Sequence, residues 1–499
     1  MLLPKSLSQC SVLFALLACA TVAVGQPAGR PAGSVEKFVA NLTPGYAAVE
    51  GSAINIDTAK LCCDKLLPTA LFFNKSAPYV AFSVQNLHSP PPMFQELPLF
   101  QLRADEAIVA IGVTPPEAKF FSYTPYLMTR TYPPATTPDL VFASWGESIN
   151  VNTIKTLGPG PFSRQVALIF TPDRNTEARV RAALRVAGYP DAMINTLPFP
   201  APILQLGLDP VGHPLTKDVF LILNRMSMFT SKTAGQAYLD AMANSDRSQR
   251  PLRVFRITPS RDGALSPFPV QPRRVRGNGT SELAFAPDLE RLRKAILDTY
   301  KDSYHYTEYH TKAAAYDGYE YIARRKNTLG DSPDALYYVA GYLPMWDLGN
   351  PEDELTLGPN DFLVVYGPRH DATGKATYAN INVYASEKVM FSLASVYSDS
   401  FGGSVDEFLG AGDPAAGVMY ATKFAYPGQC SGTHCSPLVV PANCTPWCPL
   451  PTYPDCPPFV LNLSTKLGVF IRNYLEPSTD VGPAYGELLY DQVIKFSPK

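Results

Sequence analysis

The sequence predicts an α+β protein made of two duplicated β-rich units, sandwich- or barrel-like, with intervening helices and a C-terminal disulfide-bound loop. Three observations predict it: a faint internal repeat, apolar runs typical of strands, and a cysteine cluster near the C-terminus. The 499 residues suffice for two or three domains with their own cores. We divide the chain into a leader (1–25), a first unit (26–250), a linker (251–279) and a second unit (280–499).

The internal repeat relates residues 102–112 to residues 357–367 without a gap. A Tyr-Val-Ala triplet precedes each copy, at Tyr79–Ala81 and at Tyr338–Ala340. The alternative is convergence, in which two strands that follow an acidic turn resemble each other without common descent.

Each copy of the repeat predicts a strand, a turn and a second strand. Ala107–Ile111 and Phe362–Tyr366 are apolar runs, which is typical of strands buried on both faces. The second strands are expected over 120–127 and 377–384. In the latter, Asn380, Asn382 and Tyr384 alternate with apolar residues, which predicts a half-exposed strand.

Helices are expected mainly between the two copies. Asn175 or Thr176 caps a predicted helix near 176–187, with Gly188 as its stop. Pro287 at a first helical position begins a second helix, and a third is expected over 312–325. The segment before the second helix, 251–279, is rich in Pro, Gly, Arg and Ser and predicts the linker. Its basic run at 273–276 matches the dibasic pattern of processing proteases, and a solvated turn is the alternative.

The cysteines indicate an oxidising compartment. Neighbouring cysteines have Cα atoms about 3.8 Å apart, which is below the usual disulfide range, so Cys62 and Cys63 are expected to have distant partners. Five more lie in the Pro-rich insertion 429–458, and an odd number of thiols remains after loss of the leader. The predicted disulfide cysteines are Cys62, Cys63, Cys430, Cys435, Cys444, Cys448 and Cys456. Zinc bound by Cys444 and Cys448 is the alternative.

The N-terminal residues predict a cleavable signal peptide, with cleavage before Gln26. The apolar run is about 14 residues, shorter than the roughly 20 needed for a membrane span, so we expect a secreted, extracellular product, with the vacuolar lumen as the alternative. Sequons predict glycosylation at five positions, namely Asn41, Asn74, Asn278, Asn443 and Asn462.

Composition excludes some partners. A net charge of −2 provides no field for nucleic acid or an anionic membrane. The sequence also contains no nucleophile elbow, phosphate loop, zincin helix or dinucleotide fingerprint. No cofactor is predicted.

The second repeat copy carries the candidate catalytic residues. After the strand that ends at Gly367 come Arg369, His370 and Asp371, with Lys375 further on, whereas the first copy continues with Thr and Pro. His370 is predicted as a general base that Asp371 or a distant carboxylate orients, and Arg369 and Lys375 as groups that hold an oxyanion or carboxylate. An ordinary hydrophilic hairpin is the alternative.

The segment 300–310 carries the candidate ligand-binding residues. Tyr304, Tyr306 and Tyr309 are predicted to line a pocket for a sugar or a flat apolar ligand, with core packing as the alternative. A second interpretation of the segment is a weak metal site, for which His305, Glu308 and His310 are the candidates. No regular element presents all three of these side chains on one face.

The resulting hypotheses belong to three classes. The first is an extracellular metal-independent hydrolase or lyase that acts on a small or apolar substrate in a cleft between the units. The second is a non-catalytic carbohydrate- or lipid-binding protein, and the third is a cell-wall or matrix component. A small-molecule, lipid or carbohydrate ligand is therefore the expected partner.

Overall fold

The structure is a computed structural model that describes residues 33–43, 45–67, 69–75, 77–84, 96–314, 318–342, 354–386, 390–441, 444 and 461–499. Within these residues the chain is mixed α+β, with four β-sheets and seven α-helices. None of the described helices has both the length and the apolar character needed to cross a membrane.

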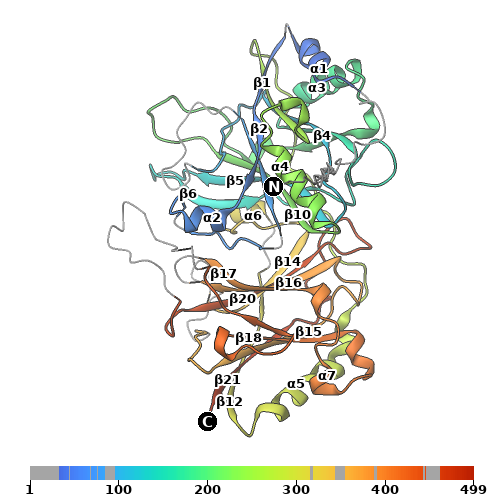
Figure 1. Cartoon of the computed structure of the whole chain (residues 1–499). Coiled ribbons are helices and arrows are strands. Elements are labelled where there is room, and N and C mark those ends of the chain that lie inside the picture. Colours follow the sequence, from blue (N-terminus) through green and yellow to red (C-terminus); the bar gives the residue numbers. More distant parts are fainter. Residues whose placement is uncertain are drawn as a thin grey trace, which may run out of the picture.

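The first half of the chain forms two facing sheets (Figure 1). The outer sheet has the order β1 (Tyr46–Glu50), β11 (Leu252–Pro259), β4 (Ala107–Val113), β8 (Gln165–Thr171) and β9 (Ile194–Pro198). The inner sheet has the order β2 (Ser52–Ile56), β3 (Tyr79–Ser83), β10 (Val219–Phe229), β5 (Ala118–Arg130) and β6 (Asp139–Ser144), and β7 (Ile149–Asn150) pairs with β5. A core with members from both sheets, including Ile108, Phe121 and Ile222, lies between them.

The second half repeats this strand order. Its outer sheet runs β12 (Tyr304–Tyr309), β21 (Gln492–Pro498), β15 (Phe362–Pro368), β18 (Met419–Ala425) and β19 (Cys435–Pro437). Its inner sheet runs β13 (Lys312–Ala313), β14 (Ala335–Gly341), β20 (Leu467–Tyr474), β16 (Tyr378–Ala385) and β17 (Phe391–Tyr397). In both halves the only parallel pair among the described strands, β8 with β9 and β18 with β19, closes one edge of the outer sheet.

Helices cover the outer face of each outer sheet. Helices α1 (Val35–Leu42) and α3 (Arg174–Val186) pack on the first, and α5 (Ala286–Tyr300) and α7 (Asp406–Leu409) pack on the second. Helix α4 (Lys232–Met242) contributes Leu239 and Met242 to the first core. The two inner sheets therefore face each other in the middle of the molecule (Figure 1).

A short connection crosses between the halves in each direction. The segment between β2 and β3 contains α2 (Thr58–Cys63) and places Phe72 against Tyr384 and Phe470 of the second half. The segment between β13 and β14 contains α6 (Tyr319–Ala323) and inserts Ile322 into the first core. Each half thus supplies one connection to the surface of the other.

Several sequence predictions are confirmed at the level of elements. Strands β4, β5, β15 and β16 occupy the predicted places. Helix α3 is present, but its N-cap is Asp173, which accepts a hydrogen bond from the Thr176 N–H, so the cap predicted at Asn175 or Thr176 is wrong. Helix α5 has Pro287 in its first turn, as predicted.

Three other predictions are wrong. The helix expected over 312–325 is instead a two-residue strand, β13, followed by α6, because Lys312 and Ala313 pair with β14 and Gly318 has a positive φ of 47°. The first residues of the predicted linker form β11. Asn380, Asn382 and Tyr384 are fully buried, since their face of β16 packs toward the other half.

Two disulfides lie within the described residues. Cys430 pairs with Cys435, and Cys63 pairs with Cys444, a partner 381 residues away that ties the two halves together. Cys62 is a buried free thiol, so the expectation of a distant partner is met only by Cys63. Cys448 and Cys456 lie outside the described residues.

Candidate functional site

His370 lies in the interior, enclosed by acidic groups. It follows β15, and its side chain is 1% exposed. Its Nδ1 lies 2.8 Å from Glu282 Oε1, and its Nε2 lies 3.0 Å from Asp491 Oδ2 and 2.8 Å from the Tyr338 hydroxyl. Tyr338 and Tyr420 both donate hydrogen bonds to Asp491.

The charge state of His370 follows from these neighbours. Burial lowers the pKa of the imidazole, but the carboxylates of Glu282 and Asp491 outweigh burial and raise the pKa of His370 to about 10. The imidazolium in turn holds the pKa of Glu282 below its ordinary value against the effect of burial. At neutral pH the ring is protonated on both nitrogens, and a general base needs a free lone pair.

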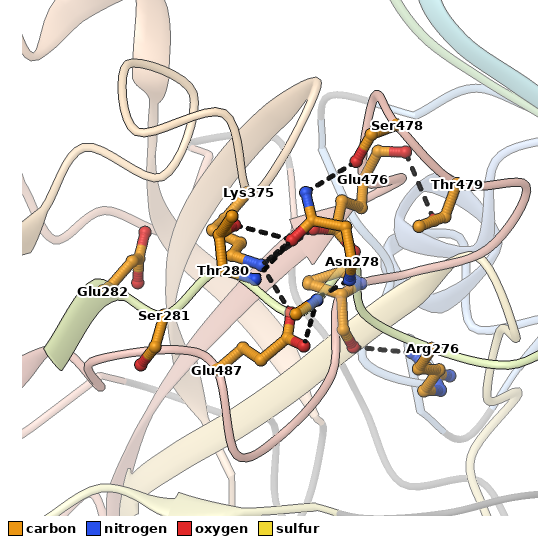
Figure 2. A network of polar contacts seen from close by, with 12 residues as sticks. Arg276, Asn278, Thr280, Ser281, Glu282, Lys375, Glu476, Ser478, Thr479 and Glu487 are labelled. Atoms are coloured by element: carbon orange, nitrogen blue, oxygen red, sulfur yellow. Dashed lines mark hydrogen bonds and ion pairs between the residues drawn. The ribbon is translucent and has the colours of Figure 1, made fainter.

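Lys375 lies in a second buried polar network (Figure 2). Its ammonium donates to Glu476 Oε1 at 2.8 Å, to Glu487 and to Asn278 Oδ1 at 2.8 Å, and its side chain is 2% exposed. Glu487 also accepts from the backbone N–H groups of Asn278 and Gly279. This network fastens the end of the predicted linker to the second half.

The predicted catalytic residues are therefore divided between different environments. Arg369 and Asp371 lie near the surface, 3.7 Å apart, and Arg369 reaches the Gly417 carbonyl. His370 and Lys375 face separate buried networks. The four side chains do not converge on one cavity that the structure describes, and their catalytic role stays a prediction.

The aromatic segment forms edge strand β12. Tyr304 packs against Phe362 and Phe496, whereas Tyr306 is 48% exposed and Tyr309 contacts the core between the second pair of sheets. Glu308 pairs with Arg293 rather than with a histidine. Among the described residues no group of three or more His, Cys, Asp or Glu side chains is arranged to hold a metal ion, and His305 and His310 are exposed.

The predicted glycosylation sites differ in exposure. Asn278 and Asn462 are exposed, Asn41 is half-buried, and Asn443 lies outside the described residues. Asn74 is only 2% exposed. Because a glycan needs an accessible amide, the folded structure favours Asn278 and Asn462 over Asn74.

The candidate site is a cavity of about 70 Å³ between the two inner sheets. Its wall is mostly apolar and includes Leu97, Met128, Leu221 and Leu223 from the first half. A volume of this kind has room for about five water molecules, since each needs roughly 10–15 Å³. The cavity is therefore of a size for a small molecule rather than a polymer.

Two buried arginines line this cavity. Arg225 on β10 and Arg472 on β20 occupy the third strand of their respective inner sheets, and each is 5% exposed. Each lies opposite a tyrosine of the neighbouring strand, Arg225 opposite Tyr79 and Arg472 opposite Tyr337. The strand register thus makes Tyr337, and not Tyr338 of the Tyr-Val-Ala triplet, the counterpart of Tyr79.

The hydrogen bonds of the two arginines correspond as well. Arg225 Nη2 donates to the Gly330 carbonyl at 2.6 Å, and Arg472 Nη2 donates to the Phe72 carbonyl at 3.1 Å. Both carbonyls belong to the connections that cross between the halves, and both residues have a positive φ. Each half therefore contributes one guanidinium, and the opposite half contributes the loop that holds it.

Both guanidiniums retain polar atoms without a partner. Arg225 Nε and Arg472 Nη1 have no hydrogen-bond acceptor among the described residues, and neither arginine has a described carboxylate within 4.0 Å. Burial raises the pKa of Tyr79 and Tyr337, so these phenols are neutral at physiological pH. Both guanidiniums lie over aromatic rings, Arg225 over Tyr126 and Arg472 over Tyr384. Asp331 adds an attraction to Arg225 at longer range. Neither arginine, however, has a carboxylate in direct contact among the described residues.

A second cavity adjoins the first on the side of α2. A larger cavity of about 540 Å³ shares Ile56, Thr58, Phe73 and Tyr79 with the first, and its outer wall carries polar residues such as Asp57 and Lys60. These shared residues separate the outer, polar cavity from the inner, apolar one.

Sequence reasoning missed the cavity arginines. Their one local signal is a single arginine within an apolar strand, Leu221–Met226 in one half and Val469–Arg472 in the other. This pattern is equally typical of an edge strand whose arginine points to solvent. Only the packing of the two inner sheets, which joins residues far apart in the chain, distinguishes the two cases.

Comparisons with known proteins do not identify this chain. No family model matches it, and no curated protein sequence matches it. Among solved structures, it resembles the VPA0106 protein of Vibrio parahaemolyticus at 10% identity and a TM-score of 0.35, over 85% of this chain and 89% of that chain. It also resembles an uncharacterized protein from Burkholderia cenocepacia at 11% identity and a TM-score of 0.32, over 84% and 77%. Similarity at this level carries no argument about function.

Proposed function

We propose that this chain is a secreted, non-catalytic binding protein that holds a small ligand with an apolar body in the cavity between its two inner sheets. The observation that carries the proposal is the cavity itself: a largely apolar wall, contributed by both halves, with a few polar groups. Ligand sites in proteins typically combine such a wall with a small number of oriented polar groups.

The geometry of His370 supports binding over hydrolysis. A hydrolase with His370 as base requires an unprotonated nitrogen that reaches the substrate. In this chain both ring nitrogens contact carboxylates inside the protein, away from the cavity wall. The binding alternative needs no such group.

The correspondence between the halves supports an internal duplication. The two halves share the strand order of both sheets, the parallel edge pair, the crossing connections and the paired arginines. In this proposal the ligand site was formed where two similar units came together. The disulfides and the exposed sequons at Asn278 and Asn462 are compatible with maturation in a secretory pathway.

A thermal-shift screen of the mature chain tests the proposal. The panel consists of small alcohols, amides, amines and acids that share one apolar body, and we expect at least one class to raise the melting temperature. Ligand that binds only the folded state stabilises it by mass action. Leu223→Phe fills the cavity and should abolish the shift, whereas Leu265→Phe, at a 52% exposed position of the linker, should retain it. A panel without any shift, or an unchanged shift in Leu223→Phe, would contradict the proposal.

A further inference from the structure

The two arginines of the cavity wall lack a directly bound anion among the described residues. A guanidinium is charged at every physiological pH and cannot neutralise itself by losing a proton. Moving such an ion out of water is unfavourable unless a partner compensates for the lost hydration. Arg225 and Arg472 are both buried, and the described part of the chain places no carboxylate in direct contact with either; Asp331 interacts with Arg225 only at longer range.

Other buried arginines of this protein are paired. Arg130 contacts Asp218, and Arg256 contacts Glu106 through its Nε and Nη2 groups. Both of these pairs are at least nine-tenths buried. Arg225 and Arg472 have no such direct carboxylate partner among the described residues, and both line the same cavity.

We propose that the ligand of the cavity is a short-chain carboxylic acid whose carboxylate binds at Arg225 and Arg472 and whose apolar tail contacts the leucines of the wall. This inference deepens the proposed function and rests on it. Arginine presents a planar set of N–H donors that matches the two oxygens of a carboxylate. Arg225 Nε and Arg472 Nη1 are the donors left over for that purpose.

The remaining wall favours a carboxylate with an apolar body over a phosphate. A phosphate has more acceptor oxygens to satisfy, and apart from the two arginines the wall offers few side-chain donors, among them Tyr79, Tyr337 and Thr58. Leu97, Met128, Leu221 and Leu223 present only apolar atoms. A short hydrocarbon chain gains free energy from contact with these residues, whereas an inorganic anion does not.

Titration calorimetry with hexanoate and hexanol tests the inference on the unmodified mature chain. The two probes share a hydrocarbon tail and differ in the charge of the head. We expect hexanoate to bind at one site per chain and hexanol to bind at least tenfold more weakly. Inorganic phosphate serves as a third probe and should bind at least tenfold more weakly than hexanoate.

Arginine variants connect this binding to the site. Arg225→Met and Arg472→Met should each weaken hexanoate binding at least tenfold and leave hexanol binding unchanged. Each variant loses the hydrogen bond of its guanidinium to the Gly330 or the Phe72 carbonyl, so we expect both unliganded variants to fold with a somewhat lower melting temperature, which a thermal melt checks. Arg291→Met, at an exposed pair with Asp413, is the matched control and should not alter the affinity of either probe.

The outcomes separate the inference from the proposed function. Equal binding of hexanol and hexanoate overturns the carboxylate inference but leaves a cavity that binds small apolar ligands. Phosphate binding as tight as that of hexanoate also overturns it. If no member of a wider panel binds, the proposed function fails together with the inference. If the arginine variants do not fold, the inference is decided by the comparison of hexanoate, hexanol and phosphate on the unmodified chain.

Discussion

Replacement of His370 by glutamine should change the pH dependence of stability. The pKa of His370 is raised to about 10 in the folded protein, against an unfolded value of 6.5. A raised pKa means that the folded state binds the proton more tightly than the unfolded state. The resulting stabilisation is fully present below about pH 6.5, decreases as the pH rises, and is lost above about pH 10.

The magnitude follows from the separation of the two pKa values. Each pH unit between them changes the free energy of unfolding by about 1.4 kcal/mol. The stability difference between the parent and His370→Gln should therefore shrink by roughly 4 kcal/mol between pH 6.5 and pH 9.5. Glutamine does not titrate, so the variant itself lacks this slope.

Urea denaturation followed by fluorescence at pH 6.5, 8 and 9.5 measures the effect. His213→Gln is the matched control, because His213 lies in an exposed loop and its replacement should leave the pH profile unchanged. A difference between parent and His370→Gln that stays constant with pH would refute the reasoning. So would a magnetic-resonance titration in which His370 loses its proton near pH 6.5.

Two further predictions concern stability. Lys375→Met leaves Glu476 buried without a cation and should lower the free energy of unfolding by about 3–5 kcal/mol. The double variant Lys375→Met with Glu476→Gln should recover part of this loss. A urea denaturation series that shows no recovery would contradict the ion-pair explanation. Cys444→Ser opens a loop of 381 residues, and in the loop-entropy model it should cost about three times as much stability as Cys435→Ser, which opens one of five. Calorimetric melting compares the two, and equal losses would argue against loop closure as the cause.

The sequence predicts where the strands lie better than it predicts which of their side chains are buried. Ala107–Ile111 and Phe362–Tyr366 are buried strands as their apolar runs indicate, because such a run is buried whichever neighbours it acquires. Asn380 and Asn382 have a polar alternation that indicates solvent, yet they are buried, since the second half packs against the first. Contact between distant sheets leaves no periodic pattern in either strand.

The candidate site was less predictable for the same reason. His370, Arg369, Asp371 and Lys375 are neighbours in the chain, and proximity in sequence suggested a common site. In the structure His370 and Lys375 face different polar networks. The carboxylates that contact His370 belong to Glu282 and Asp491, which are distant from it in the sequence.

The bond between Cys63 and Cys444 has a consequence for the basic segment that joins the halves. Arg274 contacts Ser148 of the first half and the Asp480 carbonyl of the second, and neighbouring Val275 is 83% exposed. The segment lies inside the ring that the disulfide closes. A protease that cut the chain there would produce two polypeptides that remain covalently joined until the bridge is reduced, so cleavage alone does not release either half.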